Sequence, residues 1–265
     1  MKRFYNLEVH YKGQNYFGWQ KQKDFKTIQG TLETTLKDLV GSDSIRTMGS
    51  SRTDTGVHSL ANVCFVQIPC EFTPQQLKEK LNQLLPDEIH IERCERTYSH
   101  FKVIYFAKSK QYIYLFKNLP EDIESNYFTN IPEKLNIEKM KEATKSFIGV
   151  HDFTNFSYKP SKNAEKVREI FKCEIVESQD YIKGEDREDC YALVIEGSGF
   201  LKQMVRIIMG TLFNIGHGKV EIEDIEVSYD SSVFHKTGFI TPGAGLYLNH
   251  IDFIRDPFKG HKVQE

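Results

Sequence analysis

The order of strand-like and helix-like segments limits the folds that this chain can adopt. Alternating apolar and polar residues indicate strands, and apolar residues at helical spacing indicate helices. The two kinds of segment intermix without the regular strand–helix–strand rhythm that builds a parallel sheet. The order therefore predicts an α+β fold with mainly antiparallel strands. In chain order, we expect a strand at 3–11, a helix from Ile28 to Val40, strands near 44–48 and 60–68, a helix from Pro74 to Leu85, strands from Ile89 and Lys110, a helix at Ile137–Ile148, strands near 167–177 and 190–196, a helix at Phe200–Gly216 and a strand at 245–253.

The composition is that of an ordinary soluble globular protein. Of the 265 residues, 39% are hydrophobic and 27% are charged, and no apolar run approaches the ~18 residues of a membrane-spanning helix. The basic residues at the start of the chain are not followed by an apolar segment, so we expect no signal peptide. Five scattered cysteines then indicate reduced thiols in a cytoplasmic protein.

The net charge of −2 counts mildly against nucleic-acid binding, which usually requires an excess of lysine and arginine. Net charge is a sum over the whole surface, however. A local basic face on a nearly neutral protein can still bind phosphates. The charge therefore leaves an RNA-binding function open.

Sequence motifs for metal, nucleotide or serine-hydrolase chemistry are missing. The chain has no Cys-x-x-Cys and no His-Glu-x-x-His, and its nine histidines are dispersed. The glycines at 197 and 199 are not followed by the third glycine of a dinucleotide-binding loop, and no phosphate-binding loop or Gly-x-Ser-x-Gly is present. We therefore expect chemistry by ordinary side chains, without a metal or cofactor.

The segment SSRTDTGVHS, residues 50–59, contains the Asp-Thr-Gly triplet in which aspartic proteases present a carboxylate. Two carboxylates must share one proton in such a protease, but this chain has one such triplet. Arg52, two residues away, would also hold Asp54 ionised instead of letting it share a proton. Asp54 is therefore a turn residue that bonds nearby amides or the single carboxylate of another enzyme.

Five separated motifs resemble those of the tRNA pseudouridine synthase A family, and they occur in the same order. GSSRTDTGVHSLANVCF, around Asp54, is similar to the family's Gly-Arg-Thr-Asp-x-Gly-Val-His loop. YFGWQKQ at 16–22 resembles its Tyr-x-Gly-Trp-Gln-x-Gln, and GSGFLKQMVRIIMGTL at 197–212 resembles its Phe-Leu-x-x-Met-Val-Arg helix. HDFTNFS and TPGAGLYL match the remaining landmarks, so that the resemblance extends from about residue 3 to about residue 253.

The resemblance implies the pseudouridine-synthase fold, with a bent, mainly antiparallel sheet, flanking helices and a central active-site cleft. Residues 1–104 would carry the aspartate loop, and residues 105–265 the tyrosine strand and the arginine helix. It implies an enzyme that isomerises uridine to pseudouridine without cofactor or metal, in the anticodon stem-loop of tRNAs (tRNA positions 38–40). It also implies a homodimer, and the target base would have to be flipped into a pocket.

The resemblance assigns roles to particular residues. Asp54 would be the essential carboxylate, acting as a nucleophile or base on the sugar or on the uracil. Arg206, on the long helix, would pair with Asp54 and keep it charged. Tyr112 matches the family's active-site tyrosine, whose ring can stack on uracil and whose hydroxyl could move a proton.

Substrate contacts are expected from further residues. Arg52 would contact a phosphate or help to flip the base, and Leu246 would form part of the apolar wall beside it. Lys202, one helical turn before Arg206, is assigned to substrate binding. His58 is expected to be a structural hydrogen-bonding residue. Trp19 and Gln20 either pack against the aspartate loop or contact RNA.

Several positions depart from the family pattern. Ser51 replaces a glycine, Thr55 replaces an alanine, Pro242 and Gly243 replace an Ala-Pro pair, and the basic residues before Tyr112 are reduced. These departures concern RNA contacts, so we expect an intact catalytic group and altered substrate choice. Alternatives are a related enzyme for a ribosomal RNA uridine, or a non-catalytic RNA-binding or RNA-folding protein.

Overall fold

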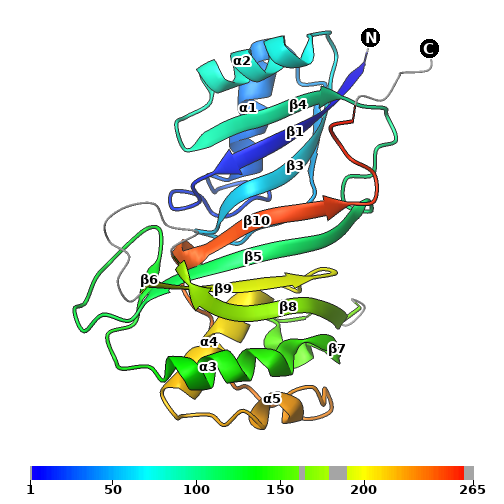
Figure 1. Ribbon diagram of the computed structural model, residues 1–265. Helices are drawn as coiled ribbons and strands as arrows, with labels where there is room; N and C mark the ends of the chain where they lie inside the picture. Colours follow the sequence, from blue (N-terminus) through cyan, green and yellow to red (C-terminus); the bar gives the residue numbers. More distant parts are fainter. Residues whose placement is uncertain (1, 161–164, 179–189, 260–265) are drawn as a thin grey trace. The chain divides into compact units, whose positions relative to one another are not determined.

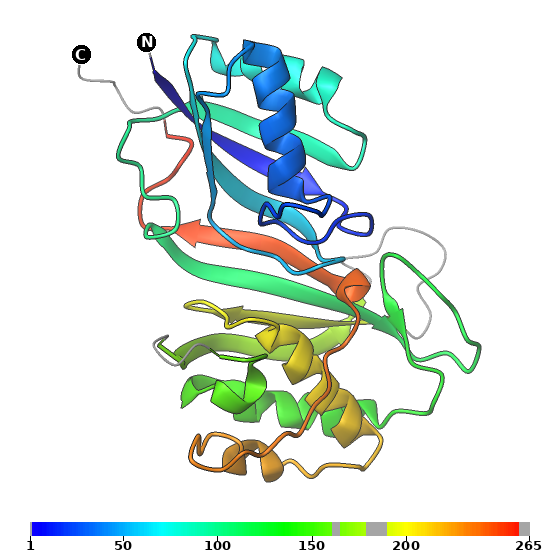
Figure 2. The same cartoon turned by 180° about the vertical axis from the view of Figure 1, so that it is seen from behind.

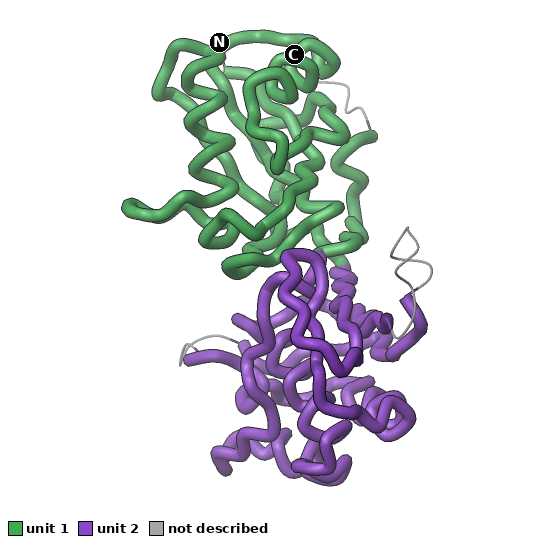
Figure 3. The backbone as a smooth tube through the Cα atoms, turned by 90° about the vertical axis from the view of Figure 1, so that its left-hand side faces the viewer, with its two compact units in different colours: residues 1–108, 248–265 green, residues 109–247 purple. Residues whose placement is uncertain are grey.

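The computed structural model describes residues 2–160, 165–178 and 190–259. The chain divides into two compact units (Figure 3). Unit 1 comprises residues 1–108 and 248–265, and unit 2 comprises residues 109–247. From the sequence we expected one division, after residue 104. In the structure the chain leaves unit 1 after residue 108 and returns to it at residue 248.

Unit 1 is built on an antiparallel sheet (Figure 1). Its strands are β1 (Arg3–Tyr11), β2 (Arg46–Gly49), β3 (His58–Ile68) and β4 (Ile89–Arg96). The order is β4–β1–β3, and β2 pairs with the other side of β3 along part of its length. The alternating pattern at 3–11 is the whole of β1, in which Tyr5, Leu7 and Val9 are fully buried.

Helices α1 (Ile28–Val40) and α2 (Pro74–Leu84) lie on one face of this sheet (Figure 1 and Figure 2). Their starts follow from local residues, because the hydroxyls of Thr27 and Thr73 accept hydrogen bonds from backbone N–H groups in each first turn. Helix α1 ends at Gly41, whose φ of 62° lies in the left-handed region that favours glycine. The apolar sides of both helices and the inner face of β1 form the core of unit 1.

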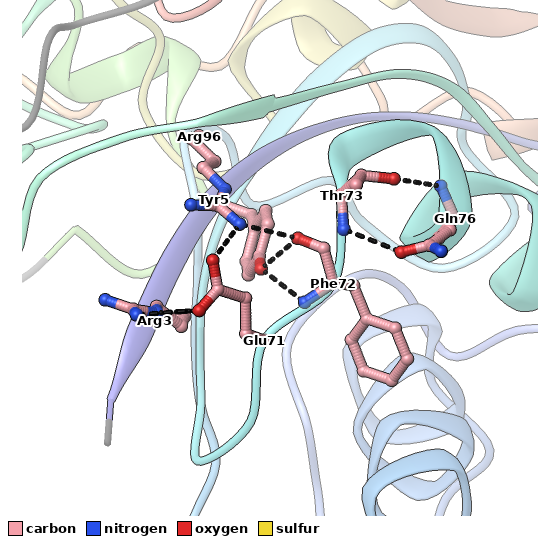
Figure 4. A network of polar contacts seen from close by, with 7 residues as sticks. All are labelled: Arg3, Tyr5, Glu71, Phe72, Thr73, Gln76 and Arg96. Atoms are coloured by element: carbon pink, nitrogen blue, oxygen red, sulfur yellow. Dashed lines mark hydrogen bonds and ion pairs between the residues drawn. The ribbon is translucent and has the colours of Figure 1, made fainter.

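A polar network joins the start of β1, the end of β4 and the segment before α2 (Figure 4). The Glu71 carboxylate pairs with Arg3 at 2.7 Å and with Arg96. The hydrogen bond from Arg96, followed by that from Arg3, lowers the pKa of the Glu71 carboxyl. The Tyr5 hydroxyl donates to the Phe72 carbonyl at 2.7 Å and accepts from the Phe72 N–H at 3.0 Å.

The strands of unit 2 lie in the order β5–β9–β8–β7, each antiparallel to its neighbours, and β6 pairs with β5 in parallel (Figure 1). They are β5 (Ala107–Lys117), β6 (Thr129–Asn130), β7 (Gly149–Asp152), β8 (Val167–Glu177) and β9 (Cys190–Gly197). Strand β10 (Leu246–Phe253) leads from unit 2 back into unit 1. The α+β class with mainly antiparallel strands is thereby confirmed.

The helices of unit 2 are α3 (Ile137–Ala143), α4 (Met204–Gly216) and α5 (Asp224–Val227), and described 3₁₀ turns lie at Thr144–Phe147, Thr154–Phe156 and Gly243–Gly245. Helix α4 packs on β5 through the ring of Phe213. That ring meets Phe116 at 5.3 Å between centroids and Tyr114 at 6.4 Å, both near edge-on. Phe213 is therefore one contact between this helix and the sheet.

Two helix boundaries expected from the sequence were wrong. The helix expected from Phe200 begins at Met204, because Gln203 has a left-handed φ of 60° that interrupts the helical path. The helix expected to reach Ile148 ends at Ala143, and the chain continues as a tighter 3₁₀ turn. In the polar segment expected to be a surface loop at 157–166, residues 161–164 lie outside the described part of the chain.

Within the described residues, no helix has the length and apolar character needed to cross a bilayer. The five cysteines are free thiols.

Candidate active site

Asp54 lies in the segment that connects β2 to β3 in unit 1. Its side chain is half-buried, and its carbonyl accepts the Val57 N–H at 3.2 Å, which closes a turn. Gly56 has a left-handed φ of 78° within this turn. The Asp-Thr-Gly triplet is therefore a tight turn, as local turn chemistry predicts, and it presents the aspartate before the chain enters β3.

A buried asparagine holds the chain immediately before Asp54. Asn62 lies on β3 and has no exposed surface. Its Oδ1 accepts from the Ser50 hydroxyl (2.9 Å) and the Ser51 N–H (3.1 Å). Its Nδ2 donates to the Ser51 carbonyl at 3.1 Å and to the Tyr11 hydroxyl at 3.3 Å. Both backbone groups of Ser51 are thus bound by one side chain.

The same network continues to the residue next to Asp54. The Tyr11 hydroxyl lies 2.8 Å from Oγ1 of Thr53, and both side chains are buried. The Ser50 hydroxyl also accepts the Val63 N–H at 3.1 Å. Because buried hydroxyls and amides are costly without partners, this set of bonds favours one conformation of residues 50–53.

The segment after β1 supports the loop from its other side. The Trp19 N–H donates to the Thr53 carbonyl at 3.0 Å, and the Gly56 N–H donates to the Tyr16 carbonyl at 3.3 Å. A Cβ atom on Gly18 would lie 2.6 Å from the Thr53 carbonyl oxygen, so only glycine permits this approach. The YFGWQKQ and aspartate motifs, far apart in the sequence, therefore form one structure.

His58 and Trp19 are both buried, as expected if they support the structure. His58 is buried, and its Nδ1 accepts the Gly13 N–H at 3.2 Å. The Trp19 ring is 1% exposed and packs against Gly49 and Tyr11. Trp19 therefore packs beneath the loop, and the prediction of a structural hydrogen bond for His58 is confirmed.

The substitutions in the aspartate loop differ in exposure. Ser51, where the family pattern has glycine, is buried among its bonds to Asn62. Arg52 and Thr55 are exposed on either side of Asp54. The exposure of Arg52 is compatible with a substrate contact, which stays a prediction.

Arg206 lies in the first turn of α4 in unit 2 and is half-buried. Its Nε donates to the Thr241 carbonyl at 2.6 Å, and the Thr241 hydroxyl donates to the Arg206 carbonyl at 3.1 Å. A Cβ atom on Gly210 would lie 2.0 Å from the Phe239 carbonyl oxygen. The small residue thus lets the 238–242 segment lie directly on α4, which orients the arginine side chain.

The three aromatic residues that alternate along β5 occupy different surroundings. The Tyr112 ring is 7% exposed and meets Phe200 edge-on at 5.3 Å between centroids. Phe116 is fully buried in the core against α4. Tyr114 is also fully buried, and its hydroxyl donates to the Pro242 carbonyl at 3.0 Å. Burial raises the pKa of the Tyr114 hydroxyl to about 12, so it stays protonated at neutral pH.

Leu246 and Lys202 are the remaining expected substrate contacts. Leu246 is 4% exposed and opens β10, directly after Gly245, whose backbone lies against the Leu115 carbonyl. Lys202 is exposed, and its Nζ lies 5.0 Å from the centroid of the Tyr158 ring.

The expected site residues are thus divided between the units. Unit 1 holds Arg52 and Asp54, and unit 2 holds the others: Tyr112, Lys202, Arg206 and Leu246. The Pro242 and Thr241 carbonyls bring the Tyr114 hydroxyl and the Arg206 side chain to the same short segment before β10. The pairing of Asp54 with Arg206 and the central cleft stay predictions. No cluster of metal-ligating side chains occurs among the residues described here.

Sequence reasoning missed the supporting role of Asn62 and Tyr11. One signal was available, since Asn62 is a polar residue at an inward position of an otherwise apolar strand pattern. Its partners could not be read from the sequence, because Tyr11 lies on another strand.

Comparison with known proteins provides independent information. The model of a family described as tRNA pseudouridine synthase matches residues 8–105 and 143–253. The chain is 33% identical to "tRNA pseudouridine synthase A 2" of Bacillus cereus (strain ZK / E33L) over 252 residues, which cover 94% of this chain and 99% of the relative. It is 36% identical to "tRNA pseudouridine synthase A" of Caldicellulosiruptor saccharolyticus over 244 residues, covering 91% and 96% of the two chains. The relative of that name in Thermoanaerobacter sp. (strain X514) gives the same identity and coverage.

Proposed function

Because the chain belongs to the tRNA pseudouridine synthase family, we propose that it isomerises uridine in the anticodon stem-loop of tRNAs, with Asp54 as the essential carboxylate. The family assignment makes it an isomerase that converts uridine to pseudouridine. The stem-loop as the target, at tRNA positions 38–40, and the roles of individual residues are the parts proposed here.

The observation that carries the proposal is the way in which the Asp54 turn is held. Ser51 and Thr53, on the N-terminal side of the aspartate, are bound by buried side chains of β1 and β3. Gly56, on its other side, is bound by the backbone of Tyr16. Asp54 itself is only partly buried. Such support of a reactive group from several elements is what catalysis by positioning requires.

The reaction needs no external reactant. The bond between N1 of uracil and C1′ of ribose breaks, the base turns, and a bond from C5 to C1′ forms. The proton on C5 is lost and N1 gains a proton, so that product and substrate have the same composition. An ionised Asp54 can serve as a nucleophile or as a base, on the sugar or on the uracil.

The remaining proposed roles fall on residues of unit 2 and on Arg52 of unit 1. The Arg206 guanidinium would keep Asp54 negative and oriented, since an opposite charge stabilises the ionised form. The Tyr112 ring would stack on the flipped uracil, and Leu246 would form an apolar wall beside it. Arg52 and Lys202, both exposed, would contact phosphates of the RNA. We further propose a homodimeric protein that acts in the cytoplasm.

The test is the variant Asp54→Asn, compared with Asp43→Asn. Asp43 pairs with Lys37 on the surface of unit 1, outside the proposed site. The first variant should bind unmodified tRNA transcripts and form no pseudouridine, whereas the second should act like the wild type. Wild-type turnover by Asp54→Asn would remove this carboxylate from the mechanism.

Mapping of pseudouridine in tRNA and ribosomal RNA, from cells with and without the protein, tests the substrate. Loss of pseudouridine only at anticodon stem-loop sites is the expected result. Loss at a ribosomal RNA site, with intact tRNA, would contradict the proposed target. No change at any site would contradict the enzyme itself.

A further inference from the structure

Two aromatic side chains are exposed on the segment that precedes α1. Phe17 and Phe25 are each 49% exposed, and their ring centroids are 4.6 Å apart with an angle of 49° between the rings. Exposed apolar side chains that occur singly need no explanation, but a contacting pair of phenylalanines forms a surface that water solvates poorly. The pair is therefore a candidate binding surface.

Hydrogen bonds to both backbone groups of Phe17 hold the loop in place. The Phe17 N–H donates to the Lys26 carbonyl at 2.9 Å, and Nε2 of Gln22 donates to the Phe17 carbonyl at 3.2 Å. A β-bridge also joins Gln22 to Phe25. The two rings thus stand on a closed loop, so that little backbone freedom would be lost on binding.

The same loop is attached directly to the aspartate loop. The residue before Phe17, Tyr16, accepts the Gly56 N–H through its carbonyl, and Trp19, two residues after Phe17, donates to the Thr53 carbonyl. These two bonds lie on either side of Asp54 in the chain. The aromatic pair is therefore next to the proposed site of chemistry, within unit 1 itself.

The charge of the loop identifies the kind of partner. Residues 21–26 contain three lysines and one acidic residue, Asp24, and Lys21 pairs with Glu33 of α1 at 2.8 Å. The loop together with Glu33 thus keeps a net charge of +1 in a protein whose net charge is −2. The three lysines and Asp24 are exposed. Aromatic rings interspersed with lysines are suited to single-stranded nucleic acid, where the rings stack on bases and the lysines contact phosphates.

From these observations we infer that Phe17 and Phe25 form a stacking platform for an unpaired base of the RNA substrate beside the flipped uridine. The inference rests on the proposed function. Flipping one nucleotide out of a loop leaves its neighbours without a stacking partner. The aromatic pair beside the aspartate loop replaces that partner, and it holds the RNA while the uridine is in the site.

Steady-state kinetics on an unmodified tRNA transcript test the platform. Phe25→Leu keeps an apolar side chain and removes the aromatic face, so KM for the transcript should rise about tenfold while kcat changes less than about twofold. Phe171→Leu is the matched control, because Phe171 is 45% exposed on β8 of unit 2. An unchanged KM for Phe25→Leu would overturn the inference.

A fluorescence measurement tests the contact directly. The chain has one tryptophan, Trp19, which is buried, so wild-type protein provides the background signal. In Phe25→Trp, RNA binding should quench the added tryptophan, because the indole stacks on a base. Quenching equal to the wild-type background would reject the platform. A wild-type protein that modifies no tRNA would contradict the proposed function. An active wild-type protein whose Phe25 variants keep the wild-type KM and quenching would contradict the platform alone.

Discussion

Replacing Asn62 with alanine should free the Asp54 loop from its support. The Asn62 amide makes four hydrogen bonds, two of which satisfy the backbone of Ser51. A typical hydrogen bond contributes about 0.5–1.5 kcal/mol, and each buried group that loses its partner costs about 1–3 kcal/mol. Since alanine removes the hydrogen bonds of Asn62 to both backbone groups of Ser51, the free energy of unfolding should fall by about 3 kcal/mol.

Turnover should fall with the loss of this support. Ser51 is three residues before Asp54, so a relaxed Ser51 allows the carboxylate to move. A displacement of about 1 Å can reduce an enzymatic rate about 100-fold. We expect kcat to fall at least about tenfold for this reason. Because the proposed phosphate contact Arg52 is adjacent to Ser51 in the same loop, KM for tRNA should rise as well.

Asn6→Ala is the matched control. Asn6 is also fully buried, on the neighbouring strand β1, but its amide donates to the Pro257 carbonyl at 2.9 Å and not to the aspartate loop. This variant should lose about 1 kcal/mol of stability and keep the wild-type kcat. Urea unfolding measures the first quantity, and release of tritium from C5 of labelled uridine measures the second. Equal kcat values for the two variants would refute the positioning role of Asn62.

Three other perturbations test separate parts of the structure. Arg206→Leu should lower kcat at least about 100-fold with tRNA binding retained, because Asp54 would lose the proposed counter-charge; a fully active variant would reject the pairing. Gly210→Ala should lower the free energy of unfolding by about 1–3 kcal/mol, since its Cβ would lie 2.0 Å from the Phe239 carbonyl oxygen, and unchanged urea unfolding would contradict this. The hydrogen bonds from Arg96 and Arg3 make the pKa of Glu71 lower in the folded protein than in the unfolded chain. Its ion pairs therefore contribute their full stability above the unfolded pKa, and this contribution is lost as the pH falls through the folded pKa. The stability difference between wild type and Glu71→Gln should therefore be greatest near neutral pH and shrink in acid, and a difference independent of pH would rule out this contribution.

Local patterns were sufficient for the longer elements of this fold. The strand at 3–11 and the helix from Ile28 to Val40 match the structure, because alternation, a threonine cap and a terminal glycine act between residues that are near in sequence. Two short strands were not found, although the four-residue β2 lies close to the strand expected near 44–48. Strands β6 and β7 contain two and four residues, too few to show a period, and they exist because neighbouring strands pair with them.

The start of α4 shows a different kind of failure. Its apolar spacing begins at residue 201, so the pattern continues across the point where Gln203 takes a left-handed conformation. The apolar period indicates which residues are buried, but it does not indicate the backbone conformation between them. Packing in the folded chain decided that boundary.

For the aspartate, the sequence by itself determined the chemical group and the turn that carries it, since Asp54 and Gly56 are parts of one local motif. Only the tertiary structure decided what holds the motif: Tyr11 from β1, Asn62 from β3 and the backbone around Gly18 converge on it. The physical reason is that a short loop can choose its own turn, but it cannot provide buried hydrogen-bond partners for its own backbone. Those partners come from strands that meet only when the sheet has formed.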